Sequence, residues 1–164
     1  IRNAVGCMEF GGCFLNKRLN RNNDGGTTRR TTDIFQLATT VLFQNPVQNF
    51  ALAPNNLKDV SPVCMDYMKT VPTTWDETCF IDGYPGKYVV LARRHGNTWY
   101  LAAVNAGKEI VKLKLDLDMF AGKTVSLYKD DKKGEPQLVT LKVKESGKVQ
   151  LEILPQGGVV LVNN

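Results

Sequence analysis

The chain has 164 residues, a net charge of +5 and 43% hydrophobic residues, which suits one domain or a small domain with an attached segment. This composition excludes a wholly disordered chain, and no apolar run approaches the roughly 20 residues of a membrane-spanning helix. Basic residues are spread along the chain rather than gathered with aromatics between them, so we expect no nucleic-acid partner.

The chain begins at Ile1 and shows no secretory signal pattern, which predicts a processed chain or a fragment of a longer one. The stretch from Ile1 to Phe10 is apolar and ends at Gly11-Gly12, which predicts a short buried strand. Residues 16–30 have no apolar period and are expected to form a loop.

Two helices are expected next. The apolar residues of the first recur at helical spacing: Ile34, Leu37, Ala38, Val41 and Leu42. Thr32 can cap this helix, which should end before Pro46. The second helix has Ser61 as its cap and Pro62 in its first turn, and it should end before Pro72.

From Pro72 onward the apolar period changes to two, which is typical of β-strands. Seven strands are expected, namely Lys87–Arg94, Asn97–Asn105, Glu109–Asp116, Lys123–Lys129, Gln137–Lys144, Lys148–Leu154 and Gly157–Val162. Short strands separated by turns every eight to twelve or so residues predict an antiparallel β-sandwich.

The two parts of the chain therefore differ in character. One strand, a loop and two helices bury little by themselves, because each helix needs a partner for its apolar side. We interpret residues 1–71 as the end of a larger domain that docks on a sandwich formed by residues 72–164. The fold class is an α+β fragment.

Few residues are arranged for hydrolytic chemistry. His95 is the only histidine, and its place in a hairpin turn argues against a histidine-based triad. Asp76 and Glu77 are adjacent, so on an extended strand they point to opposite faces, and a hydrogen-bonded joint beside Trp75 is the favoured interpretation. Other carboxylates, at Asp116, Asp118, Asp130 and Asp131, are typical of turns and strand ends.

Cys7, Cys13, Cys64 and Cys79 form no CxxC pair, so a structural zinc site is not expected and reduced thiols are favoured. Aromatic residues on a sandwich can stack on sugar rings. The candidates are Trp99, Tyr100, Tyr84, Tyr88 and Tyr128, although one of the adjacent pair Trp99 and Tyr100 should lie in the core.

Met8 and Glu9 are the two candidates for contact with a substrate. Both stand at the carboxyl end of the first expected strand, which is the end that faces the active site in a β/α barrel. Without a barrel around it, Glu9 would be a cap or loop charge.

The segment PTTWDETCFIDGYPGKYVVLARRHGNTWYLAAVNA, Pro72–Ala106, resembles the start of the C-terminal β-domain of glycoside hydrolase family 97. This family contains the SusB-like α-glucosidases and α-galactosidases typical of gut Bacteroidetes. The segment Arg2–Phe10 resembles the last strand of the family's catalytic barrel, and Thr31–Phe50 resembles its final helix. The segments Leu117–Lys123 and Gly157–Val162 fit the same family.

The resemblance implies that residues 1–71 are the end of a (β/α)₈ barrel and that the catalytic carboxylates lie upstream, so none falls on this chain. The parent would cleave α-glucosidic or α-galactosidic bonds of oligosaccharides with two carboxylates, inverting or retaining according to their separation. The resemblance also implies that the parent binds calcium through upstream glutamates and is periplasmic or secreted. This segment itself would be structural, with a non-catalytic carbohydrate-binding module as the alternative.

The sequence departs from the family pattern within residues 1–71, the part that would belong to the barrel and lie near bound substrate. Glu9 stands in place of the usual Asp, Gly11-Gly12 in place of Thr-Pro, and Phe35 where relatives often have His.

Overall fold

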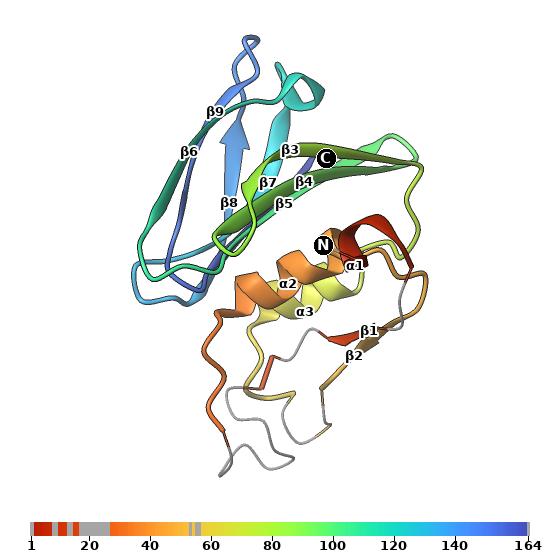
Figure 1. The fold of residues 1–164 in the computed structure, drawn as a ribbon, viewed down its shortest axis with the longest axis vertical. Helices are drawn as coiled ribbons and strands as arrows, with labels where there is room; N and C mark the ends of the chain where they lie inside the picture. Colours follow the sequence, from red (N-terminus) through yellow and green to blue (C-terminus); the bar gives the residue numbers. More distant parts are fainter. Residues whose placement is uncertain are drawn as a thin grey trace.

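The computed structural model describes residues 2–7, 10–12, 15–16, 27–52, 54 and 57–163. A β-sandwich packs on a layer of helices, and a small pair of strands lies on the far side of that layer (Figure 1). No helix in the described part is long and apolar enough to cross a membrane.

The two expected helices are present. Helix α2 spans Asp33–Leu42, and the hydroxyl of Thr32 accepts a hydrogen bond from the Phe35 amide at 3.1 Å, as the capping prediction requires. Helix α3 spans Pro62–Met68 and has proline in its first turn, but the side chain of Ser61 makes no capping hydrogen bond.

The prediction of a strand from Ile1 to Phe10 is wrong for its first half. Arg2–Val5 forms a single helical turn, α1, and only Phe10–Gly12 forms a strand, β1. Strand β1 pairs in parallel with β2, Gln48–Phe50, and α2 lies between them in the chain. Strand β2 pairs only with residues 10–12. Residues 2–5 therefore have no partner in β2, and their backbone groups form hydrogen bonds within the helical turn instead.

The sandwich has eight strands in two layers. The larger layer has the order β3-β4-β5-β10-β7-β8, with every neighbouring pair antiparallel. Its strands are β3 (Glu77–Tyr84), β4 (Tyr88–His95), β5 (Thr98–Asn105), β7 (Thr124–Asp130), β8 (Pro136–Lys142) and β10 (Gly158–Asn163). The smaller layer pairs β6 (Val111–Asp116) with β9 (Lys148–Ile153), and a short 3₁₀ helix covers Asp118–Phe120.

All seven expected strands are confirmed within a few residues at each end. Strand β3 was missed, because its sequence ETCFIDGY does not alternate between apolar and polar residues. The register of β3 against β4 shifts between Phe80 and Asp82, and Gly83 has a φ of 157°. A bulge of this kind breaks the period of two on which recognition of a strand depends.

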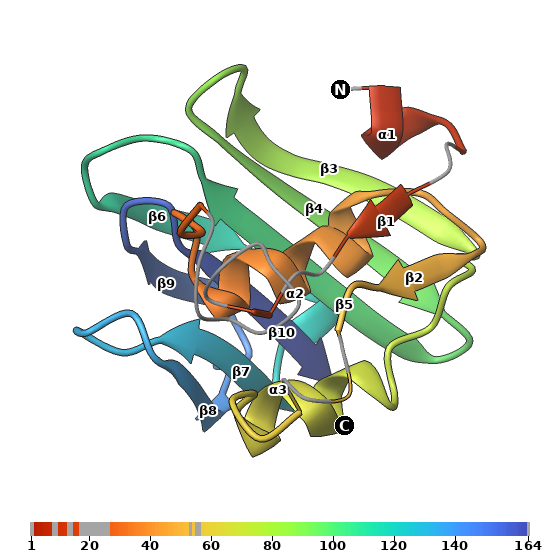
Figure 2. The ribbon, with the colours of Figure 1, turned by 90° about the horizontal axis from the view of Figure 1, so that it is seen from below.

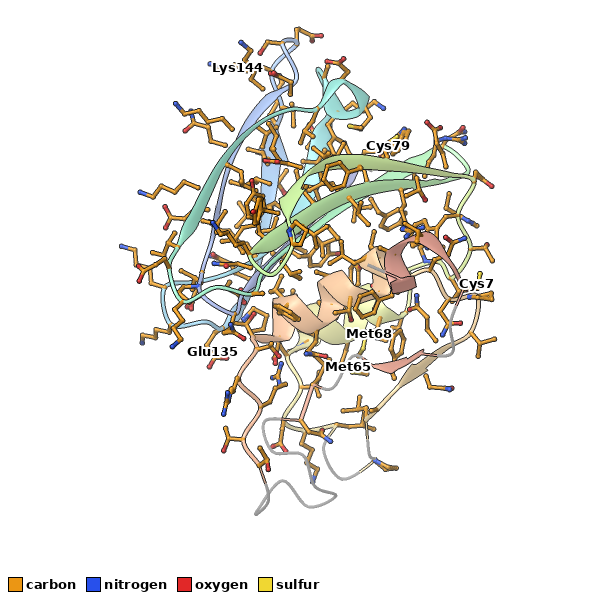
Figure 3. All side chains as sticks on the ribbon, in the orientation of Figure 1. Cys7, Met65, Met68, Cys79, Glu135 and Lys144 are labelled. Atoms are coloured by element: carbon orange, nitrogen blue, oxygen red, sulfur yellow. The ribbon has the colours of Figure 1, made fainter. Side chains whose placement is uncertain are left out.

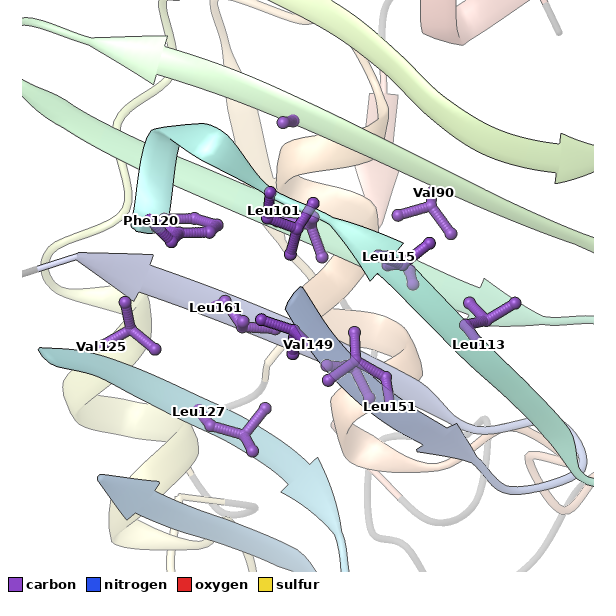
Figure 4. Packing of buried hydrophobic residues seen from close by; sticks show 14 of the residues in the cluster. Val90, Leu101, Leu113, Leu115, Phe120, Val125, Leu127, Val149, Leu151 and Leu161 are labelled. Carbon is purple, nitrogen blue, oxygen red and sulfur yellow. The ribbon is translucent and has the colours of Figure 1, made fainter. Parts of the chain in front are cut away.

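The core of the sandwich lies between its two layers. Alternate residues of β6 and β9 point inward from the smaller layer, including Leu113, Leu115 and Leu151. They meet Leu101, Leu161 and other apolar residues of the larger sheet (Figure 4). The clean alternation that predicted β6 is therefore the signature of one buried face.

The opposite face of the larger sheet, called the helix side below, is also buried. Helix α2 runs across β4, β5 and β10, while α3 lies beside β7 and β8 (Figure 2). Strands β4, β5 and β10 accordingly read as continuous apolar runs rather than alternating ones, since they are covered on both faces. The docking of the N-terminal part on the sandwich is thus confirmed.

Contact between α2 and the sheet is close at Gly158. A Cβ atom built there would lie 2.7 Å from the carbonyl oxygen of Ile34 and 2.7 Å from the Cα of Phe35. Glycine at the start of β10 therefore lets the backbone of α2 approach the backbone of the strand.

Candidate functional site

The predicted substrate-contact residues, Met8 and Glu9, lie outside the described residues. The expected loop over residues 16–30 is described only at residue 16 and over 27–30. Cys13 also lies outside the described residues. The other candidates lie within the described part, and their surroundings decide between chemical and structural roles.

Asp76 and Glu77 form a joint around Arg94. The Asp76 carboxylate accepts a hydrogen bond from the Gly96 amide at 2.7 Å, and the Nε of Arg94 donates to Glu77 at 3.2 Å. The Nη1 of Arg94 lies 3.6 Å from Asp76, so one guanidinium serves both carboxylates. Trp75 packs edge-on against Tyr100 with ring centroids 5.3 Å apart. This arrangement supports the structural interpretation made from the sequence.

His95 ends strand β4 at the tip of the β4–β5 hairpin and is exposed. Its Nδ1 lies 2.9 Å from the carbonyl oxygen of Thr74, which ties the hairpin to the segment before β3. The position agrees with the prediction of a surface-turn histidine.

The aromatic candidates divide between core and surface. Tyr100 is buried on the helix side, and Trp99 packs against the sandwich core with Arg94 about 6.0 Å from its ring. Tyr128 meets Tyr67 of α3 at a centroid distance of 5.0 Å. Tyr84 is 60% exposed, with the Lys87 ammonium 4.8 Å above its ring. Tyr88 pairs with Tyr84 across the β3–β4 hairpin, and its hydroxyl donates to Asp82 at 3.1 Å. The five candidates therefore do not share one exposed surface.

Metal-binding residues are not clustered in the described part. No group of three or more His, Cys, Asp or Glu side chains is placed there to hold an ion. Cys7 and Cys79 lie on separate segments (Figure 3), and Cys64 is buried in α3. These three cysteines are not bonded to one another. Reduced cysteines stay a prediction.

Asp130 is the last residue of β7, a strand end as expected, but its half-buried carboxyl is hydrogen-bonded within the fold rather than free in solvent. Its Oδ2 accepts hydrogen bonds from the Thr32 hydroxyl at 2.9 Å and from the Gly158 amide at 3.0 Å, while its Oδ1 is buried without a partner. Burial raises the pKa of Asp130 to about 6, and the negative charges of Asp33 and Asp131 add to this rise. The two hydrogen bonds act in the opposite direction and lower the pKa. The carboxyl links the cap of α2 to β7 and β10.

Arg93 is a second residue that the sequence did not single out. It is fully buried on the helix side of β4, and burial lowers its pKa, with the neighbouring Cys7 acting in the opposite direction. Its guanidinium donates to the Thr78 hydroxyl at 2.8 Å and to the carbonyl oxygens of Ala4 at 2.9 Å and Leu42 at 3.2 Å. One planar group thus joins α1, the end of α2 and β3.

Beside Arg93 lies an apolar groove of about 580 Å³. It runs between α1, the end of α2 and the β3–β4 hairpin, and its lining includes Val5, Phe43, Phe80, Tyr84 and Val89. Val5, Phe80 and Tyr84 are 77%, 68% and 60% exposed, which is unusual for large apolar side chains that share one surface. The groove presents mainly apolar surface, and no Asp, Glu or His side chain lines it among the described residues.

One protein-family model matches the sandwich part of the chain. Residues 74–162 match the family described as "Glycosyl-hydrolase 97 C-terminal, oligomerisation". The match starts just before β3 and ends within β10, so it takes in every strand of the sandwich.

Three relatives give the match its context. A crystal structure of a β-arabinopyranosidase is 84% identical with a TM-score of 0.95 and covers 98% of this chain, which spans 26% of that protein. A family 97 enzyme from Pseudoalteromonas sp. strain K8, in complex with acarbose, is 27% identical with a TM-score of 0.73, and covers 94% of this chain and 26% of its own. The retaining α-galactosidase of Bacteroides thetaiotaomicron is 28% identical over 135 residues, 77% of this chain and 20% of the relative. The chain therefore spans between a fifth and about a quarter of these proteins.

Proposed function

The chain belongs to glycoside hydrolase family 97, and from this membership we propose that it is the C-terminal buttress of a longer glycosidase whose chemistry lies upstream. The proposed enzyme releases β-arabinopyranosyl or α-galactosyl groups from oligosaccharides with retention of configuration. The observation that carries the proposal is the 84% identity to a β-arabinopyranosidase over 98% of the chain.

The two substrate classes are closely related in shape. A β-L-arabinopyranosyl group is an α-D-galactosyl group without the hydroxymethyl substituent at C5. A pocket that holds one ring can hold the other if the space around C5 changes, and discrimination by one small group is modest. This relation explains how proteins that share this fold can include both a β-arabinopyranosidase and an α-galactosidase.

The role of buttress is supported by the packing of α2. Ile34, Leu37, Ala38 and Val41 are fully buried, and they rest on β5 and β10 of the sandwich. The parallel pair β1–β2 with α2 between its strands forms a βαβ connection, as α/β folds do. Because β2 follows the helix taken as the final one of the barrel, this pair does not by itself identify the end of a barrel. A sheet covered in this way would hold the last barrel helix in place.

The test is hydrolysis of nitrophenyl glycosides by the longer parent and by the 164-residue chain. The parent should act on the β-L-arabinopyranoside and the α-D-galactopyranoside faster than on the α-D-glucopyranoside, and the chain alone should release no nitrophenol above buffer. Preference of the parent for the glucoside would favour an α-glucosidase instead. Turnover by the chain alone would overturn the structural role and return attention to Glu9, Asp76 and Glu77.

The alternative of a carbohydrate-binding module predicts retardation of the chain in gels that contain starch or galactan. Tyr84 is the exposed aromatic among the candidates in the described part, so Tyr84→Ala should abolish such retardation if the module binds sugar. Migration that is unchanged by the polysaccharide would favour the buttress.

We also propose, from the family resemblance alone, that the parent binds calcium through residues upstream of this chain and is periplasmic or secreted. Loss of the parent's activity in a chelator, restored by calcium, would test the first statement. Fractionation of cells that express the parent would test the second.

A further inference from the structure

The helix side of the larger sheet is covered unevenly. Leu91 of β4 is 5% exposed beneath the helices, whereas Phe80, directly opposite it on β3, is 68% exposed. Figure 2 shows α2 over β4, β5 and β10, with β3 beyond the edge of α2. Among the described strands, β3 pairs with β4 alone, so it is an edge strand of the sheet. An edge strand with exposed apolar side chains is a surface on which other polypeptide can pack.

Aromatic side chains dominate the exposed wall of the groove. A Cβ atom built at Gly83 would lie 3.4 Å from Cε2 of Phe80, so the Phe80 ring reaches along β3 to the position just before Tyr84. Lys87 is the one charged residue that lines the groove in the described part, and its ammonium lies 4.8 Å above the Tyr84 ring. Surfaces rich in aromatic residues and poor in charge are typical of the centre of a protein–protein interface.

The groove also stands out from the rest of the sandwich surface. Residues 74–162 match a family whose description names oligomerisation. In that range, the large apolar side chains that are strongly exposed in the described part are Phe80, Tyr84, Ile110 and Leu138. Phe80 and Tyr84 share the groove, whereas Ile110 and Leu138 lie outside it and are less exposed, at 47% and 46%. The groove is therefore the apolar surface of this part that best suits association.

We propose that the groove over β3 and β4 is the surface through which two copies of the chain associate. The same surface serves on both copies, so that a two-fold axis relates them and Phe80 and Tyr84 of each copy cover the groove of the other. The inference goes beyond the proposed function, because the buttress acts within one chain and this surface joins two. It rests on the proposed function only in that the copies are parts of a longer parent.

The alternative occupant of the groove is another region of the same parent. The family description favours a second copy, because it attaches oligomerisation to residues 74–162, and these residues supply most of the groove lining. A stable pair needs about 800 Å² of surface from each partner. The groove supplies the centre of such an interface, and the outer edge of β3 adjoins it.

The first test is sedimentation velocity of the parent over about a hundredfold range of concentration, since association depends on concentration. The wild type is compared with Phe80→Asp, which places a charge in the groove. The matched control is Ile110→Asp, because Ile110 is exposed and lies outside the groove, before β6. Circular dichroism checks that each variant is folded, and Tyr84→Asp replaces Phe80→Asp if the latter does not fold.

The parent should sediment as a dimer. Phe80→Asp should raise the Kd of the dimer at least about thirtyfold, as expected for a residue at the centre of an interface, while Ile110→Asp should leave the Kd unchanged. A parent that is monomeric at every concentration would overturn the proposal. Dimerisation of Phe80→Asp with the affinity of the wild type would also overturn it, because the interface would then lie elsewhere.

The second test identifies the occupant from the alkylation rate of Lys87→Cys, a cysteine at the groove. Mass spectrometry of peptides resolves this thiol from the native ones, and Ile110→Cys is the control. Alkylation of Lys87→Cys should slow as the concentration of the parent rises, while that of Ile110→Cys stays constant. Protection that is the same at every concentration would overturn the proposal, because it would assign the groove to another region of the same polypeptide.

The same parent sample is assayed on the nitrophenyl glycosides. A dimer that Phe80→Asp dissociates, in a parent that cleaves none of them, refutes the proposed activity and leaves the interface standing. A monomeric parent that cleaves the proposed substrates refutes the interface alone.

Discussion

Replacement of Asp130 by Asn should remove a pH dependence from the stability of this chain. The carboxyl lies between α2 and the sandwich, with Oδ2 bonded to the Thr32 hydroxyl and the Gly158 amide, and Oδ1 buried without a partner. An Asn side chain keeps one oxygen for the same two donors. It carries no charge, so the cost of burying an ionised carboxylate is absent.

The magnitude follows from the pKa of Asp130, which burial raises from 3.8 to about 6. At about 1.4 kcal/mol per pKa unit, this rise corresponds to about 3 kcal/mol. The folded chain binds the proton more tightly than the unfolded chain does. The stabilising contribution of protonated Asp130 is therefore fully present below about pH 4, falls as the pH rises, and is lost above about pH 6.

The assay is urea unfolding followed by circular dichroism from pH 4 to pH 8. The free energy of unfolding of Asp130→Asn minus that of the wild type should rise by up to about 3 kcal/mol between pH 4 and pH 7. A difference that does not change with pH, or that falls as the pH rises, would refute the reasoning.

Asp131 provides the matched control. Its Oδ1 accepts hydrogen bonds from the amides of Lys133 at 2.7 Å and Glu135 at 3.0 Å, and these bonds lower its pKa. Ionised Asp131 therefore stabilises the fold above its unfolded pKa, and that contribution is lost as the pH falls. The difference for Asp131→Asn should therefore stay nearly constant from pH 4 to pH 8, because the pKa of Asp131 is 3.8 in the unfolded chain and lower in the folded chain.

Three further substitutions test the packing, each by urea unfolding. Gly158→Ala should lower the free energy of unfolding by about 1–3 kcal/mol, because its Cβ would lie 2.7 Å from the Ile34 carbonyl oxygen; unchanged stability would contradict that close approach. Leu37→Ala, at a fully buried position of α2, should lower the free energy of unfolding by about 2–5 kcal/mol. Its control, Ile110→Ala at a 47% exposed position, should lower it by less than about 0.5 kcal/mol. Similar losses for the two variants would refute the docking of α2. Arg93→Lys should cost about 1–3 kcal/mol, because a single nitrogen cannot take the places of both Nη1, which donates to Thr78, and Nη2, which donates to Ala4 and Leu42. A neutral result would deny that Arg93 joins these segments.

Part of the candidate site could be predicted from the sequence, and part could not. The structural role of Asp76 and Glu77 was predictable, because Trp75 beside them indicated packing. Their meeting at Arg94 was not, because adjacent residues of one strand diverge, whereas Asp76 lies before β3. The burial of Arg93 and the hydrogen bonds of the half-buried Asp130 were not predictable. Each is surrounded by segments from elsewhere in the chain, and the partners Thr32 and Ala4 lie 98 and 89 residues away.

The sequence by itself determined the local elements of this protein. Alternation of period two marked strands such as β6, helical spacing and a Thr cap marked α2, and the segment Pro72–Ala106 carried the family resemblance. Each of these signals lies within a short stretch, because strand period, helix period and capping are properties of neighbouring residues.

Only the tertiary structure decided how these elements meet. The bulge in β3 and the helical turn at α1 depend on which strands are available for pairing, and that is set by distant residues. The order in which the strands pair, the burial of the larger sheet on both faces and the groove left over β3 depend likewise on packing between the two parts of the chain. Burial is a property of the assembled layers, so no local pattern can fix it.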